Sequence, residues 1–373
     1  MPIHGDDLGR PTYEILQTIG EGSAGVCRLA RHEVFERDVV QKTVSMLGLP
    51  DGVAREPHLL KEARHDHLIE AWEAQWEKDD SFKGLEAVTF VCPYYPDGSV
   101  HDSLISDHHF GLGNTLRICG QILDALAYLH DDRGYIHRDI KPANILLTDE
   151  RAGALLADLG SAGRINDSGW AANFGGTRLY LDPRARPDNQ VTVQSDLYSL
   201  GVVVVEMLGG RFHYETINQN EVDERLDRGQ RALPDRAYRL PPYVPANVAR
   251  LVRSLVNPNP MKRTTTAREA WTRLSRLKFV DWQRDDLDDG SQSWVGTWPP
   301  HKARELRRQF RVSSELVSRG SHAGEFRLSA RWRSPNGRGR NLGSLTRHTR
   351  AGDLVGLTQL FRAVEDVAQN SPA

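Results

Sequence analysis

The stretch YIHRDIKPANILL, residues 135–147, gathers side chains that could carry out a group transfer. Asp139 could accept a proton from a hydroxyl group, and Lys141 could neutralise charge on a phosphoryl group in transfer. Asn144, and Asp158 in the later stretch ADLG, are oxygen donors that suit Mg²⁺. A polar turn that caps a helix is the alternative, but it does not explain why an acid, a base and an amide occur at this spacing.

A glycine-rich stretch near the N-terminus, GEGSAG, is a second candidate for phosphate chemistry. Gly20, Gly22 and Gly25 would let backbone N–H groups approach phosphate oxygens closely. Taken alone, the stretch is also compatible with a plain hairpin turn. A dinucleotide-binding fold is disfavoured because a strand-like run, and not a helical one, follows the glycines.

The elements that must position these residues change in type along the chain. Residues 13–95 are predicted to be mostly strands with one helix, because runs such as RDVVQKTV and AVTFVCPYY are rich in β-branched and aromatic residues. After residue 95 apolar residues recur at helical spacing, and VQSDLYSLGVVVVEMLGG predicts a buried helix. The sequence therefore predicts an α+β, two-lobed architecture with a ligand site at the seam between the lobes.

In order and spacing, the motifs resemble those of eukaryotic-like (Hanks-type) protein kinases. The sequence carries GEGSAG, VVQK ending in Lys42, REPHLLKEARHDHLI with Glu56, HRDIKPAN, DLG, GTRLYLDPR, SDLYSLG and NPMKR. The resemblance covers about residues 13–277 and implies a β-rich N-lobe over 13–95 and a helical C-lobe over 96–277. Residues 1–12 would be an N-terminal extension.

The resemblance implies a function for each polar residue of the opening motifs. Lys42 would hold the ATP phosphates and pair with Glu56, and Asp139 would position the attacking hydroxyl group. Asn144 and Asp158 would hold Mg²⁺.

Lys141 bears on the class of substrate, because the pattern DxKPxN is typical of Ser/Thr kinases within the family. The implied activity is transfer of the ATP γ-phosphate to Ser or Thr of a protein. A catalytically weak pseudokinase that acts as a nucleotide-binding scaffold is the alternative, and a small-molecule kinase is a third interpretation.

The resemblance also outlines the nucleotide pocket. Cys92 falls at the gatekeeper position, and the hinge runs from Pro93 to Tyr95. Cys27 and Cys92 are interpreted as small buried hydrophobic residues, with a redox switch as the alternative. The full set of residues expected to contact ATP is Gly20, Glu21, Gly22, Gly25, Cys27, Val40, Lys42, Glu56, Cys92, Pro93 and Tyr95.

One position departs from the family pattern in a segment that should be buried. Arg184 stands where the family has a Glu that pairs with a buried Arg, which corresponds to Arg263. An uncompensated buried charge costs about 3–5 kcal/mol, so another acid must replace this Glu. We expect Asp182 to do so, since residues 182 and 184 point the same way if the backbone is extended.

The activation segment, SAGRINDSGWAANFGGT, holds few residues that can be phosphorylated, namely Ser161, Ser168 and Thr177. Arg138 precedes the catalytic Asp, an arrangement that resembles kinases switched on by a phosphate in this segment. Thr177 is expected to serve the substrate-binding loop, and Ser168 is the predicted autophosphorylation site. Asp167 could instead supply a permanent charge.

Bulk composition places the chain among ordinary globular proteins. Apolar residues make up 39% of the chain, charged residues 26%, and the net charge is −2. The pattern indicates neither a signal peptide nor a membrane span, and the three cysteines fit neither a zinc site nor a disulfide framework. We expect a cytoplasmic protein. The excess of Arg over Lys, 40 to 8, suggests a bacterial genome rich in G and C.

The last quarter of the chain differs in charge from the rest. Residues 296–350 contain 13 Lys and Arg against 3 acids, a balance of +10. An acidic linker is predicted over 278–295, followed by a small basic α+β accessory domain over 296–373. FRLSARW alternates with period two, which predicts a strand whose outer face carries Arg327, Ser329 and Arg331.

Three interpretations of this basic domain remain open: a plain solvated surface, docking of an acidic protein partner, and nucleic-acid binding. A homodimer that supports autophosphorylation is also considered.

Overall fold

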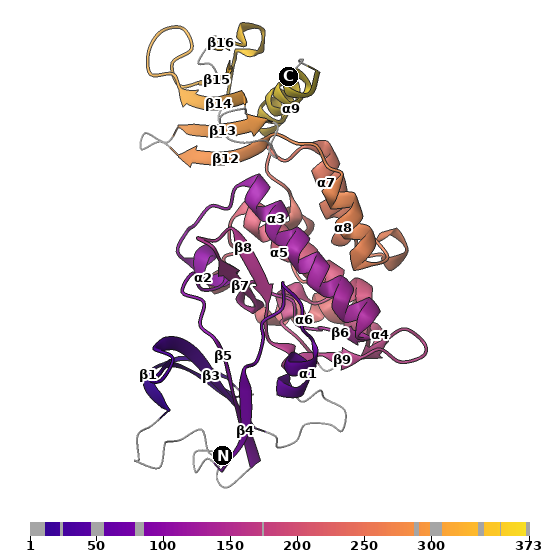
Figure 1. Cartoon of the computed structure of the whole chain (residues 1–373). Coiled ribbons are helices and arrows are strands. Elements are labelled where there is room, and N and C mark those ends of the chain that lie inside the picture. The colour runs from indigo at the N-terminus through magenta and orange to yellow at the C-terminus, as the bar shows by residue number, and fades with distance from the viewer. Residues whose placement is uncertain are drawn as a thin grey trace.

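Three structural units follow one another along the length of the molecule (Figure 1). They are a β-rich N-lobe, a helical C-lobe and a C-terminal domain in which a sheet is covered by a helix. The computed structural model describes residues 12–22, 25–45, 56–78, 86–173, 175–286, 291–298, 308–334, 339–350 and 352–370.

The N-lobe is an antiparallel sheet with the strand order β1-β2-β3-β5-β4 among the described residues. A small cluster of Ala30, Val39 and Val91 lies buried on one side of it. The elements are β1 (Tyr13–Gly22), β2 (Gly25–His32), β3 (Arg37–Ser45), α1 (Glu56–Glu62), β4 (Glu73–Lys78) and β5 (Glu86–Pro93).

The C-lobe is built around α5 (Val193–Gly209), against which α3 (Leu112–Ala127) and α7 (Ala246–Leu255) pack. All residues from 195 to 208 are buried, which confirms the predicted buried helix. The remaining helices are α2 (Val100–Ile105), α4 (Ala185–Asp188), α6 (Gln219–Asp227) and α8 (Ala267–Ser275). The short strand pairs are β6 (Tyr135–Ile136) with β9 (Gly163–Arg164), β7 (Ile145–Thr148) with β8 (Gly153–Leu156), and β10 (Ala171–Ala172) with β11 (Gln190–Val191).

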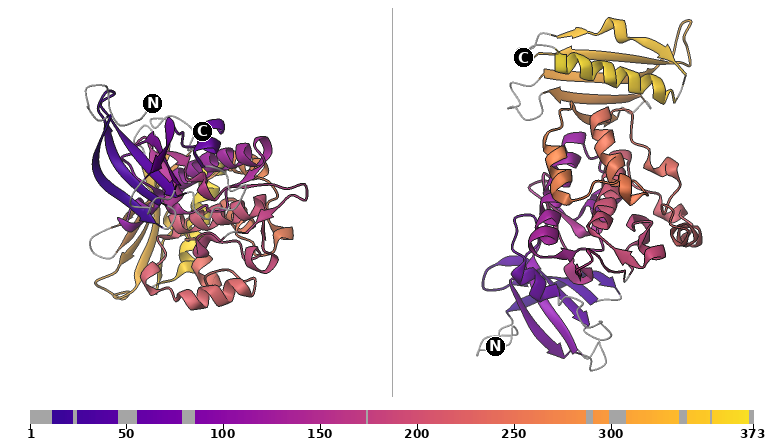
Figure 2. Two further views of the ribbon diagram at one scale, coloured as in Figure 1. Left: turned by 90° about the horizontal axis from the view of Figure 1, so that it is seen from below. Right: turned by 90° about the vertical axis from the view of Figure 1, so that its right-hand side faces the viewer.

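The C-terminal domain is an antiparallel sheet covered on one face by α9 (Leu354–Asn370), as the right view of Figure 2 shows. The rings of Trp282 and Trp294 meet Phe361 of α9 edge-on, with centroids 4.9 and 5.3 Å apart. The strands are β12 (Asp281–Asp286), β13 (Gln292–Trp298), β14 (Arg308–Leu316), β15 (Phe326–Arg333), β16 (Gly339–Asn341) and β17 (Arg347–Thr349). The predicted kinase-like α+β fold with a small additional α+β domain is confirmed.

The prediction of an acidic linker over 278–295 is wrong, because β12 and β13 lie within it and pair along their length. The charged residues of β12 obscure the alternating pattern by which a strand is predicted from sequence. Trp282 is fully buried, while Asp281 and Asp285 alternate with the inward-facing positions. The sheet therefore begins before the basic block that marked the domain in the sequence.

The C-terminal domain is seated on the N-terminal end of α3. The Gly113 N–H donates to Asp281 Oδ1 at 2.7 Å, so an acid of β12 caps a helix of the C-lobe. A Cβ at Gly113 would lie 2.5 Å from the Asp281 carboxylate, and one at Gly111 would lie 2.8 Å from Gln283. A larger residue at either position would displace these side chains of β12.

Two further contacts join the described parts of the C-lobe and the C-terminal domain. Asn247 Nδ2 donates to the Lys278 carbonyl at 2.7 Å, and Tyr243 meets Phe361 with ring centroids 6.3 Å apart. The helix α3 begins at Leu112 after Gly111, which has no side chain to cap it, and Asp281 supplies a side-chain acceptor from a distant part of the chain.

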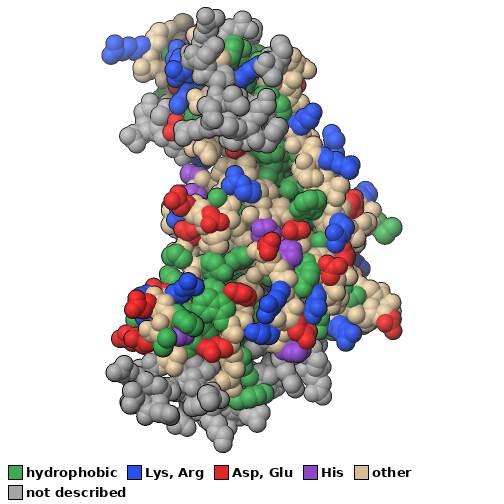
Figure 3. Space-filling model, viewed as in Figure 1, with side chains coloured by type: hydrophobic (Ala, Val, Ile, Leu, Met, Phe, Trp, Pro, Cys, Tyr) green, Lys and Arg blue, Asp and Glu red, His purple; other side chains and the backbone are tan. Residues whose placement is uncertain are grey.

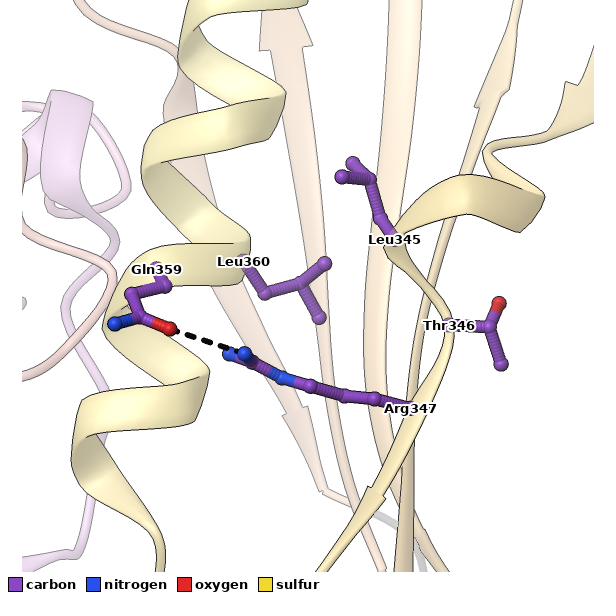
Figure 4. A pocket seen from close by; sticks show the side chains of 5 residues that line it. All are labelled: Leu345, Thr346, Arg347, Gln359 and Leu360. Atoms are coloured by element: carbon purple, nitrogen blue, oxygen red, sulfur yellow. Dashed lines mark hydrogen bonds between the residues drawn. The ribbon is translucent and has the colours of Figure 1, made fainter.

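A cavity of about 170 Å³ lies between α9 and the segment before β17 (Figure 4). Arg347 crosses it and donates from Nη1 to Gln359 Oε1 at 3.0 Å. The lining residues are Leu345, Thr346, Arg347, Gln359 and Leu360. Within the described part of the chain, no helix combines the length and apolarity needed to cross a membrane.

Candidate active site

Three charged side chains from different elements meet at the seam between the lobes. Lys42 Nζ of β3 donates to Glu56 Oε2 of α1 at 2.9 Å and to Asp158 Oδ1, just after β8, at 2.7 Å. Burial disfavours the charge on Lys42, but the two carboxylates outweigh burial and raise its pKa. Lys42 is therefore a fixed cation at this seam.

Asp158 adopts a left-handed backbone conformation, with φ of 65°. Burial alone would raise the pKa of its carboxyl, but the ion pair with Lys42 outweighs burial and lowers it. A Cβ at Gly160 would lie 3.1 Å from Glu56 Oε2 and 3.3 Å from Asp158 Oδ1, so Gly160 lets α1 approach closely.

A second cluster surrounds Asp139 in the loop between β6 and β7. Asp139 Oδ2 accepts a hydrogen bond from Lys141 Nζ at 2.6 Å, and Oδ1 accepts one from the Thr177 hydroxyl at 2.8 Å. Asn144 Nδ2 donates to the Asp139 carbonyl at 2.8 Å. The side chains that the opening motif spreads over the sequence thus converge on one carboxylate.

The loop between β6 and β7 is held in place by Asp196 of α5, a side chain that is only 1% exposed. Its carboxylate accepts the N–H groups of His137 at 2.7 Å and Arg138 at 2.9 Å, and it meets His130 Nε2 at 2.8 Å. Burial opposes ionisation of Asp196, but these hydrogen bonds outweigh burial and lower its pKa. In the sequence, SDLYSLG indicates only a family motif, and no neighbouring residue marks this function of its Asp.

The residues expected to hold Mg²⁺ fit such an ion in their chemistry. Asp158 Oδ2 and Asn144 Oδ1 accept no hydrogen bond from the described residues, whereas their other polar atoms are engaged. No group of three or more His, Cys, Asp and Glu in the described residues could hold a metal alone. This donor set suits Mg²⁺, which is commonly bound by few protein oxygens together with substrate phosphates.

The residues of the predicted nucleotide pocket lie on the strands that the sequence indicated. Val40 pairs with Cys92 across β3 and β5, and Gly20 pairs with Cys27 across β1 and β2. Burial raises the pKa of Cys92 to about 12 and also raises the pKa of Cys27, so both thiols stay protonated at neutral pH. This supports their interpretation as small hydrophobic residues, although Cys92 is buried and Cys27 is only half-buried.

The glycine-rich stretch includes the end of β1 and the start of β2. Gly22 pairs with Gly25, and Glu21 pairs with Val26. A Cβ at Gly25 would overlap the Thr43 carbonyl oxygen, so only glycine fits there. Residues 23–24 lie outside the described residues. On the hinge side, Pro93 ends β5, and Tyr95 is half-buried.

The predicted replacement for the missing Glu is confirmed. Asp182 accepts hydrogen bonds from Arg263 Nη1 at 2.6 Å and Nη2 at 3.0 Å, and both side chains are buried. Arg184 instead pairs with Asp188 at the surface. The assumed extended backbone is wrong, because the Ala185 N–H donates to the Asp182 carbonyl and closes a turn.

The activation segment is held to the catalytic loop by backbone contacts. Arg138 donates to the carbonyl oxygens of Ser161, Ala162 and Ala172. Ser161 and Ser168 are exposed, and the Ser168 N–H donates to the Asn166 side chain.

Thr177 differs from these two serines because its hydroxyl is engaged by Asp139. This contact places Thr177 beside the catalytic loop.

A strand-rich lobe over a helical lobe, with a Lys–Glu–Asp cluster between them and an Asp–Lys–Asn loop beneath, defines a protein kinase. Comparison with known families agrees: the family described as protein kinase domain matches residues 13–274. The chain belongs to this family.

Several curated proteins share part of the sequence. Mitogen-activated protein kinase kinase 2 of Arabidopsis thaliana is 30% identical over 65% of this chain and 64% of its own length. CBL-interacting serine/threonine-protein kinase 3 of the same plant is 26% identical, over 74% and 62%. Carbon catabolite-derepressing protein kinase of Candida albicans is 26% identical, over 76% and 42%. The chain thus spans less than two thirds of the length of each of these relatives.

Proposed function

We propose that the protein is a Ser/Thr protein kinase that transfers the γ-phosphate of ATP to a hydroxyl group of a protein, with Mg²⁺ as the metal. The observation that carries this proposal is the convergence of Lys141 and Thr177 on the Asp139 carboxylate, beside the cluster of Lys42 and Asp158. Family membership and the names of the relatives support the same function.

The contacts around Asp139 suit the acceptance of a hydroxyl group. Asp139 would orient the attacking hydroxyl and take its proton, while Lys141, 2.6 Å away, would offset charge on the transferring group. The Thr177 hydroxyl would fix one oxygen of the Asp139 carboxylate and thereby hold this carboxylate in a single orientation. Such catalysis acts through position and charge, and needs no covalent intermediate on the enzyme.

The seam between the lobes would hold the nucleotide. Lys42, oriented by Glu56, would bind the phosphates, and the apolar side chains of Val40 and Cys92, paired across β3 and β5, would contact the adenine ring. Asn144 and Asp158 would hold Mg²⁺, which neutralises phosphate charge when bound. A pseudokinase scaffold is disfavoured because Lys42, Asp139 and Asp158 are all present and directed at one site.

Ser168 stays the proposed autophosphorylation site because it is exposed in the activation segment. The backbone contacts of Arg138 support activity without this phosphate, since three carbonyl oxygens already satisfy its guanidinium group. A bacterial source and a cytoplasmic location remain inferences from the sequence, and a homodimer remains a hypothesis.

The test is incorporation of γ-phosphate from ATP by the purified chain, beside Asp139→Asn and the surface control Asp188→Asn. We expect labelled Ser or Thr, identified by mass spectrometry, for the wild type and the control but not for Asp139→Asn. Addition of EDTA should stop the reaction, and Mg²⁺ should restore it. Nucleotide binding without any labelling, with or without a generic protein substrate, would instead support the scaffold alternative.

A further inference from the structure

The open face of the C-terminal sheet is polar, in contrast to the face beneath α9. In β15, Leu328 and Ala330 are buried on the α9 side, whereas Arg327, Arg331 and Arg333 are exposed on the other. The predicted outer face is thus confirmed. Figure 3 shows Lys and Arg side chains projecting from this part of the molecule.

Positive charge on this face is concentrated across two strands. Arg311 of β14 stands directly opposite Arg331 of β15 in the strand register. Like charges in opposite positions destabilise a sheet. The repulsion between Arg311 and Arg331 is reduced by Asp285, whose Oδ2 lies 3.0 Å from Arg311 Nη1.

The charge balance along β15 is uneven. Arg327 donates to Glu315 Oε2 at 2.5 Å. The hydrogen bond from Arg327, with a smaller effect from the charge of Arg331, lowers the pKa of Glu315. Arg331 and Arg333 have no hydrogen bond or ion pair with any described residue. Within the described part of the chain, the positive charge that no acid pairs with therefore lies at the C-terminal end of β15.

Hydroxyl groups lie beside these arginines. Ser313 and Ser329 are opposite each other, with oxygen atoms 2.8 Å apart, and Ser293 accepts a hydrogen bond from Arg311. Ser293 and Ser313 are buried, and these hydroxyl groups already take part in hydrogen bonds within the sheet. The exposed guanidinium groups therefore supply the donors of this face, and guanidinium groups suit carboxylates.

The spacing of the two exposed arginines along β15 matches that of side chains on an extended chain. Arg331 and Arg333 are two residues apart on one strand, so their Cα atoms are about 6.6–6.8 Å apart. Acidic residues at alternate positions of an extended peptide have the same spacing. Among the described residues of β12–β15, the open face presents no Phe, Tyr or Trp on which nucleic-acid bases could stack.

We propose that the open face around Arg331 and Arg333 binds an extended acidic segment of a protein partner, with carboxylates at alternate positions. Its purpose, recruitment of a partner to the kinase, rests on the proposed function. The binding itself does not, so it can be measured without ATP.

The test is fluorescence anisotropy of the full chain with a labelled peptide of alternating Glu and Ser. A peptide of the same composition with all Glu in one block, and an oligothymidylate strand, serve as comparison ligands. The variant is Arg331→Glu/Arg333→Glu. The matched control is Arg250→Glu/Arg253→Glu, the same change of charge on the exposed side of α7.

We expect the alternating peptide to bind more tightly than the block peptide. The Arg331→Glu/Arg333→Glu variant should weaken this binding roughly tenfold or more, since two charge-assisted contacts are reversed, and the control variant should stay within about twofold. Arg331→Gln/Arg333→Gln replaces this variant if the charge reversal unfolds the domain.

An equal loss of peptide affinity in both charge-reversal variants, or no binding of the alternating peptide to the wild type, would indicate a plain solvated surface. Tighter binding of oligothymidylate, lost in the Arg331→Glu/Arg333→Glu variant, would show a nucleic-acid site. Either result would overturn the proposal. Neither bears on phosphotransfer, which the Asp139→Asn experiment tests.

Discussion

Lys42 is held by two carboxylates at the seam between the lobes. A neutral side chain at this position could not supply the same fixed positive charge. We expect Lys42→Met to lower the rate of phosphotransfer by about 10²-fold or more, because a preorganised charge at the phosphates is lost. Lys262→Met, at an exposed position, is the control. A steady-state assay at saturating ATP checks the prediction, and a rate within tenfold of wild type would contradict the assigned function of Lys42.

Asp182 compensates a buried Arg263, whereas Asp188 pairs with Arg184 at the surface. We expect Asp182→Asn to reduce the free energy of unfolding by about 3 kcal/mol, since Arg263 keeps the carbonyl contacts to Asn257 and Gln194 but loses its counter-ion. Asp188→Asn should cost about 0–1 kcal/mol. Urea unfolding of both variants measures the difference, and equal losses would argue against a buried ion pair.

At the scale of elements, α3 depends on a cap from another domain. Asp281→Ala removes the acceptor of the Gly113 N–H, and we expect a loss of about 1 kcal/mol of unfolding free energy. Asp285→Ala on the same strand removes only an exposed ion pair and should cost less. Thermal unfolding of the two variants, followed by circular dichroism, compares them; a larger effect at Asp285 would be unexpected.

The helix α9 is tied to β12 by Glu365, which accepts the Val280 N–H at 2.9 Å and Trp282 Nε1 at 3.2 Å. Burial raises the pKa of Glu365 above its ordinary value of 4.5. The folded chain therefore takes up a proton at higher pH than the unfolded chain. It gains stability as the pH falls from the folded pKa toward 4.5.

We expect Glu365→Gln to remove this gain from urea unfolding measured between pH 7 and pH 5. Glu269 is the opposite case, because hydrogen bonds from Thr265 lower its pKa below the ordinary 4.5. The stability that it contributes is therefore lost only as the pH falls below 4.5, and Glu269→Gln should leave the unfolding free energy between pH 7 and pH 5 with the pH dependence of the wild type. If the wild type and Glu365→Gln show the same pH dependence, Glu365 does not titrate as its burial implies.

At the scale of the whole molecule, the C-terminal domain covers Gly111, Gly113 and Tyr243 of the C-lobe. A chain that ends at residue 277 would leave these surfaces in water. We expect it to unfold at a lower temperature than the full chain by several degrees, as is usual for a loss of about 1 kcal/mol or more. Differential scanning calorimetry measures this shift, and an unchanged transition temperature would mean that the interface contributes little.

The catalytic cluster could be predicted because Asp139, Lys141 and Asn144 stand close together in one motif. The anchor Asp196 was missed, since its partners include backbone N–H groups, which leave no pattern of side chains in the sequence. β12 was missed because charged residues outnumber the single buried Trp282 in its six positions. Its position as the first strand of a sheet depends on pairing with β13, which a local pattern does not show.

The cap on α3 also has a consequence for synthesis on the ribosome. The donor Gly113 and the acceptor Asp281 are 168 residues apart in the chain. At translation rates of about 5–20 residues per second, the acceptor leaves the ribosome roughly 8–34 s after the donor. During that interval the N-terminal end of α3 in the nascent C-lobe is uncapped, and the surface that the C-terminal domain later covers is exposed. A chaperone could bind this surface before the C-terminal domain is synthesised.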